Sequence, residues 1–141
     1  NCYGPEGTWT GGREKAPAAL CRKVAESTDG TIEVWGDGSA VRSFIYVDDL
    51  VEGVRRLVDS DVSDPTNIGT REYVSVRELV DLVSSSAEKE ITPLWVPGPV
   101  GVQNRNFSND RIESLGFEPT FDLVQGLANT YPWIASQVAS N

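Results

Sequence analysis

The triplet Arg13-Glu14-Lys15 has the residue types for acid–base chemistry. It follows a loop rich in glycine, and Pro17 opens an alanine-rich run directly after it. Proline is favoured in the first turn of a helix, because its missing N–H would have no partner there. We therefore predict that a helix begins near Pro17 and that Lys15 lies at or just before its N-terminus.

A lysine at that place has unusual electrostatics. The N-terminal end of a helix carries about half a positive charge, which disfavours an ammonium group. Lys15 is therefore predicted to exchange protons with a bound molecule. The residue types and spacing alone favour a solvated charged turn, because most Arg, Glu and Lys side chains lie at the surface.

Arg42 and Arg105 are suited to a different task. A guanidinium group is always charged and donates hydrogen bonds in a fork that matches phosphate oxygens. Each of these arginines follows a glycine-containing loop, although an isolated arginine beside a strand is usually a surface residue. Both are candidates to contact a nucleoside diphosphate.

The elements that must position these residues alternate between strands and helices. The predicted strands are residues 31–35, 41–47, 65–69 and 91–96, and Pro93 places the last of them at a sheet edge. After the first helix, further helices are predicted to begin at Asp48, Ser75, Asn109 and Asp122. Short strands that alternate with helices predict an α/β fold.

Two features of these elements concern their buried faces. In the helix that Asp48 is predicted to cap, one face is apolar and consists of Leu50, Val51, Val54, Leu57 and Val58. Capping explains Asp48 and leaves no need for a catalytic pair with Asp49.

We predict that Trp9 is a hydrophobic plug beneath the glycine-rich loop and that the other three tryptophans, Trp35, Trp95 and Trp133, are core residues.

Composition excludes several classes of function. The net charge of −9 opposes binding to nucleic acid and to anionic membranes. Two cysteines are too few for a disulfide scaffold, and without histidine a Cys/His metal cluster cannot form, so we expect no metal. No apolar run approaches the length of a membrane span, and a cytoplasmic protein is expected.

Several motifs resemble those of a known family. Asn1-Cys-Tyr-Gly-Pro resembles the N-x-Y-G-P motif of extended short-chain dehydrogenase/reductases that act on nucleotide sugars. Within that superfamily, the block GTWTGGREKAPAALCRK resembles the GDP-mannose 3,5-epimerase family. The resemblance continues through WGDGSAVRSFIYVDDLVEGV, PTNIGT, PGPVGVQNRN and LGFEPT, so it covers nearly the whole chain.

The resemblance implies a role for particular residues. Lys15 would be one member of an acid/base pair whose partner, a cysteine in the family, occupies a position outside this chain. The substrate would be contacted by Asn1, Glu14, Ala16, Lys23, Ala40, Val41, Arg42 and Arg105. Ala40 departs from the glutamine of the family, so that segment lacks one polar side chain.

The resemblance also implies the reaction. The complete enzyme would oxidise a GDP-sugar at C4 with bound NAD, invert C3 and C5 through the acidified C–H bonds, and return the hydride. Two alternatives stay open: another NDP-sugar 4-epimerase or 4,6-dehydratase of the same superfamily, and a non-catalytic module that binds a nucleotide sugar.

Two motifs of the family do not occur in this sequence. They are a strand-linked G-x-x-G-x-x-G, which would bind NAD, and Y-x-x-x-K, which would supply the tyrosine base and its lysine partner. We therefore expect residues 1–141 to be a single C-terminal substrate-binding region. It would comprise the last elements of a Rossmann sheet and a small α/β lobe, with NAD bound mainly upstream and a homodimer formed through upstream helices.

Overall fold

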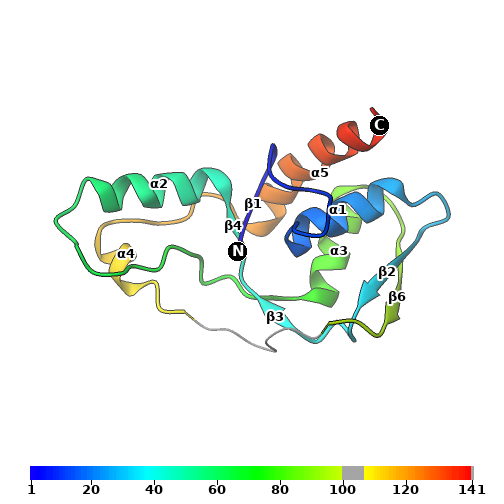
Figure 1. Cartoon of the computed structure of the whole chain (residues 1–141), viewed down its shortest axis with the longest axis horizontal. Coiled ribbons are helices and arrows are strands. Elements are labelled where there is room, and N and C mark those ends of the chain that lie inside the picture. The colour runs from blue at the N-terminus through cyan, green and yellow to red at the C-terminus, as the bar shows by residue number, and fades with distance from the viewer. Residues whose placement is uncertain (100–106, 141) are drawn as a thin grey trace.

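The computed structural model describes residues 1–99 and 107–140, and its mixed architecture confirms the predicted α/β class (Figure 1). The elements in chain order are β1 (Cys2–Tyr3), α1 (Ala16–Glu26), β2 (Thr31–Trp35), β3 (Val41–Arg42), β4 (Ile45–Tyr46), α2 (Val47–Val58), β5 (Val74–Ser75), α3 (Val76–Ser86), β6 (Thr92–Val96), α4 (Asp110–Ser114) and α5 (Leu123–Ala139).

The described strands form three two-stranded sheets. β1 pairs in parallel with β4, β2 pairs in parallel with β6, and β3 pairs antiparallel with β5. Pro93 lies opposite Ile32 in the β2–β6 pair. A proline there is tolerated because each strand of a two-stranded sheet has an open edge.

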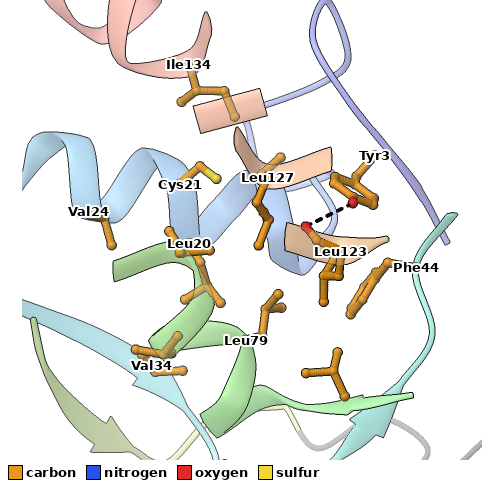
Figure 2. Close-up of a cluster of buried hydrophobic side chains, with 14 of the residues drawn as sticks. Tyr3, Leu20, Cys21, Val24, Val34, Phe44, Leu79, Leu123, Leu127 and Ile134 are labelled. Atoms are coloured by element: carbon orange, nitrogen blue, oxygen red, sulfur yellow. Dashed lines mark hydrogen bonds between the residues drawn. The ribbon is translucent and has the colours of Figure 1, made fainter. Parts of the chain in front are cut away.

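The main core lies between α1, α3 and α5 (Figure 1). Figure 2 shows side chains of these helices and of β1 and β2 converging on one cluster. Its fully buried members are Cys21 and Val24 from α1, Leu79, Val80 and Val83 from α3, and Leu127 and Ile134 from α5. Burial of one aliphatic side chain of this size contributes about 1.5–3 kcal/mol, so this cluster fixes how α1 sits on its neighbours.

The starts of α1, α3 and α5 follow the sequence signals. Lys15 is the N-cap of α1, as predicted from Pro17, although its side chain forms no capping hydrogen bond. The capping boxes of α3 and α5 both form: Ser75 pairs with Glu78, and Asp122 pairs with Gln125. These reciprocal bonds satisfy donors that the first turn of a helix leaves without partners.

The prediction for α2 was wrong in two respects. Its N-cap is Tyr46, and Asp48 lies exposed in the first turn. Of the apolar residues expected on one inner face, Leu50 and Leu57 are half-buried, whereas three valines (Val51, Val54 and Val58) are exposed. The helix is turned so that its buried residues are Asp49 and Gly53, because Asp49 binds the chain before α5 and Gly53 packs closely against Ile68.

Two predicted strands also differ in the structure. Residues 41–47 form two short strands, β3 and β4, and the helix α2 already begins at Val47. Residues 65–69 form no strand, because none of the described strand pairs includes them. A strand is defined by its partner, which a single stretch of sequence does not specify.

Asp49 anchors α2 and provides a test of this arrangement. Its side chain is 2% exposed and accepts hydrogen bonds from Thr120 N at 2.9 Å, Thr120 Oγ1 at 2.7 Å and Phe121 N at 3.0 Å. In Asp49→Asn, a side-chain amide would face one of these donors. We expect a loss of about 1.5–3 kcal/mol in the free energy of unfolding of the full-length protein, measured with urea.

The matched control is Asp48→Asn, one residue away and exposed. This change should cost less than about 1 kcal/mol, the usual contribution of an exposed carboxylate in the first turn of a helix. Equal losses in the two variants would contradict the anchoring role of Asp49.

Candidate functional site

Three clefts border the N-terminal segment, residues 1–16. The large cleft, of about 580 Å³, lies between the glycine-rich loop at residues 10–12, the first two turns of α1 and the end of β2. The lysine cleft, of about 220 Å³, lies on residues 2–8 and contains Lys15. The asparagine cleft, of about 210 Å³, contains Asn1, Asn67 and Asn109.

The large cleft brings together three of the predicted substrate residues. Glu14, Ala16 and Lys23 all line it. Ala16 and Lys23 are two turns apart on α1, so residues 16, 19, 20 and 23 form one continuous wall. The Nζ of Lys23 donates to the carbonyl of Glu33 at 2.6 Å, which ties this wall to β2.

Glu14 is the most strongly constrained acidic group of the large cleft. Its side chain is 8% exposed, and its two oxygens accept hydrogen bonds from Gly12 N at 2.7 Å and from Arg22 Nη2 at 3.3 Å. The pKa of Glu14 is lowered, first by a hydrogen bond from its own backbone amide and then by those from Gly12 and Arg22. The carboxylate is therefore held in its charged form.

The lysine cleft places Lys15 on a different side from Glu14. Lys15 is exposed and shares this cleft with Arg13, Cys2 and Tyr3. Its backbone is extended, with φ −78° and ψ 158°, which directs consecutive side chains to opposite sides. Burial raises the pKa of the Cys2 thiol, so Cys2 is kept in its neutral form.

The remaining predicted residues lie elsewhere. Asn1 is in the asparagine cleft, where its Nδ2 donates to the carbonyl of Ser43 at 3.2 Å. Ala40, Val41 and Arg42 line none of the three clefts, and the carbonyl of Ala40 accepts from Val76 N at 3.0 Å. Arg105 lies outside the described residues. Of the predicted residues that the structure describes, Glu14, Ala16 and Lys23 therefore lie together in the large cleft, and Asn1, Lys15, Ala40, Val41 and Arg42 do not line it.

The tryptophans differ from one another in burial. Trp35 is 62% exposed and lines the large cleft, so the prediction that it is a core residue was wrong. The alternating pattern of β2 indicates this exposure. Ile32 and Val34 face inwards, so the residue between them and Trp35 after them face outwards. Trp9, Trp95 and Trp133 are partly buried against the main core, which agrees with the predicted plug and core positions.

The chain is similar to several known proteins. Residues 1–69 match the NAD dependent epimerase/dehydratase family. Over 139 residues the chain is 52% identical to GDP-mannose 3,5-epimerase of Arabidopsis thaliana, a match that covers 98% of this chain and 37% of that protein. This chain resembles the GDP-mannose 3,5-epimerases. GDP-L-fucose synthase 1 of Arabidopsis thaliana is 32% identical over 145 residues, covering 99% of this chain and 45% of that protein.

A solved structure shows the same relationship in three dimensions. UDP-glucose 4-epimerase of Thermotoga maritima, solved with UDP-glucose, matches with a TM-score of 0.87 and 26% identity. The match covers 98% of this chain and 44% of that chain. The fold is therefore that of part of an extended short-chain dehydrogenase/reductase, and the chain spans less than half of the length of these relatives.

Two kinds of feature are absent from the described residues. None of their helices is both long enough and apolar enough to cross a membrane. Within residues 1–99 and 107–140, no group of three or more acidic or cysteine side chains is placed to hold a metal ion.

Proposed function

We propose that this chain binds a GDP-sugar and that the full-length protein inverts C3 and C5 of that sugar through a transient 4-keto intermediate. The observation that carries the proposal is the 52% identity to a GDP-mannose 3,5-epimerase over 98% of this chain, against 32% for a GDP-L-fucose synthase. The proposed substrate contacts are Asn1, Glu14, Ala16, Lys23, Ala40, Val41, Arg42 and Arg105.

Lys15 is proposed to move protons. A ketone at C4 acidifies the neighbouring C–H bonds, so a base can remove a proton from C3 or C5. Inversion then requires a proton donor on the opposite face of the sugar ring. Lys15 suits this task because its ammonium is exposed in the lysine cleft, while its backbone is held as the N-cap of α1 by the bond from Ala19 N at 2.9 Å.

NAD would supply the oxidation and reduction at C4, and none of the described strand-to-helix connections has the form of a dinucleotide-binding turn. A dinucleotide-binding turn passes from a strand into a helix within about six residues. The glycine-rich connection from β1 to α1 is longer, since it runs over residues 4–15, and β4 and β5 pass into α2 and α3 without a loop. The proposal therefore places most of the NAD site outside this chain.

The large cleft is proposed to receive the nucleotide. It offers an exposed indole at Trp35, the apolar stem of Lys23 and the backbone of the loop at residues 10–12. An indole stacks on the face of a nucleobase, and glycines allow close approach to a phosphate. Its volume of about 580 Å³ is within the range of small-molecule sites.

Stacking on Trp35 can be tested directly. In the full-length protein, Trp35→Ala should weaken GDP binding by about 1–3 kcal/mol, the contribution of one stacked base, measured by calorimetry. Trp35→Phe should retain most of the affinity, and Trp133→Phe, on α5, is the matched control. If Trp35→Ala bound GDP as tightly as the parent protein, the nucleotide would not lie in the large cleft.

The role of Lys15 is tested by kinetics. Lys15→Ala should slow epimerisation of GDP-mannose by about 10²–10⁴-fold, the usual contribution of one general acid or base, with little change in substrate affinity. Lys15→Arg should be similarly slow, because a guanidinium does not give up its proton. Arg55→Ala, on the exposed side of α2, is the control. A large loss of affinity at an unchanged turnover number would instead make Lys15 a binding residue.

A further inference from the structure

Arg22 joins two carboxylates beside the large cleft. Its Nη2 donates to Glu14 Oε1 at 3.3 Å, and its Nη1 donates to Glu26 Oε2 at 2.8 Å. The second oxygen of Glu14 accepts from the backbone N–H of Gly12 at 2.7 Å. A continuous series of hydrogen bonds therefore runs from Glu26 through Arg22 and Glu14 to the loop at residues 10–12.

That loop has little else to hold it. Gly11 and Gly12 adopt φ values of +90° and +83°, in the left-handed region that favours glycine. A Cβ built on either residue would meet no described atom within 4 Å, so side-chain packing does not restrict the loop there. Because glycine loses more conformational entropy on ordering than other residues, the Glu14–Gly12 bond helps to stabilise this loop conformation.

One donor of Arg22 has no partner. Its Nε is buried and has no hydrogen-bond partner among the described residues. A buried donor without a partner is destabilising. Arg22 also lies in the wall of the large cleft, next in sequence to Lys23. An arrangement that costs stability at a cleft points to a role in that cleft.

We propose that Arg22 is a positioning residue for the large cleft, which fixes Glu14 and, through Glu14, holds the Gly11–Gly12 loop in the shape that receives a nucleotide sugar. The identity of the ligand rests on the proposed function, whereas the effect of Arg22 on the loop does not. Arg22 acts through Glu14, and Glu26 holds the opposite end of the guanidinium. Glu26 itself does not line the large cleft.

The first test is binding of GDP-mannose to the full-length protein by calorimetry. Arg22→Met should raise the Kd about tenfold, as expected for loss of a hydrogen bond between charged groups. Arg22→Lys should raise it similarly, since an ammonium cannot bridge both carboxylates in forked geometry. Arg22→Met in a Glu14→Gln background should cause no further loss. Arg56→Met, which removes an ion pair on α2, is the control and should not change the Kd.

The second test needs no ligand. Hydrogen–deuterium exchange of the peptide containing Gly12 should be faster in Arg22→Met and in Glu14→Gln than in the parent protein. The thermal midpoint of Arg22→Met should fall, because Glu14, whose side chain is 8% exposed, loses its guanidinium partner. A merely structural role would lower the midpoint but leave the Kd of the folded protein and the exchange at Gly12 unchanged, and that result would overturn the proposal.

These experiments separate the role of Arg22 from the proposed function. If the parent protein does not bind GDP-mannose, the proposed function is wrong, and faster exchange at Gly12 in Arg22→Met still supports the positioning role. If the parent protein binds GDP-mannose and Arg22→Met binds it equally well, the positioning role is overturned. Additive losses from Arg22→Met and Glu14→Gln, or unchanged exchange at Gly12, would also overturn it.

Discussion

The packing of α1 against α5 and α3 is the interaction on which the rest of the structure depends. Cys21 and Val24 are fully buried in this contact, and burial raises the pKa of the Cys21 thiol to about 12, so it behaves as a small apolar side chain. Because this face of α1 cannot turn away from the core, the face that carries Ala16 and Lys23 must line the large cleft. The extended backbone at the N-cap then sends Glu14 and Lys15 to different sides, so one short segment serves two clefts.

Local charge differs from overall charge in this chain. The net charge is −9, yet the two clefts beside α1 contain cationic side chains: Arg13 and Lys15 in one, and Arg22 and Lys23 in the other. The acidic side chain of the large cleft, Glu14, accepts hydrogen bonds from Gly12 and Arg22. A nucleoside diphosphate would meet donors on α1, whereas the excess of negative charge lies elsewhere and opposes longer polyanions.

Local sequence signals predicted the elements that position the site. The features that they did not predict depend on tertiary contacts. Pro17 and the two capping boxes act within one turn of chain, so the starts of α1, α3 and α5 could be predicted. The orientation of α2 depends on Asp49 reaching Thr120, 71 residues away, which no local pattern contains. The alternation of β2 indicates that Trp35 is exposed, whereas its residue type favours the core. The sequence alone could not show that Glu14 and Lys15 line different clefts, because this depends on the backbone angles of Lys15.

We propose that the full-length protein inverts C3 and C5 of a GDP-sugar, and isotope incorporation reports directly on this reaction. GDP-mannose is incubated with the full-length protein and NAD in D₂O, and the sugar is analysed by NMR spectroscopy. We expect deuterium at both C3 and C5 of the sugar, with a product epimerised at these two carbons. Deuterium at neither carbon, with UDP-glucose converted in place of GDP-mannose, would contradict it and assign the protein to a 4-epimerase.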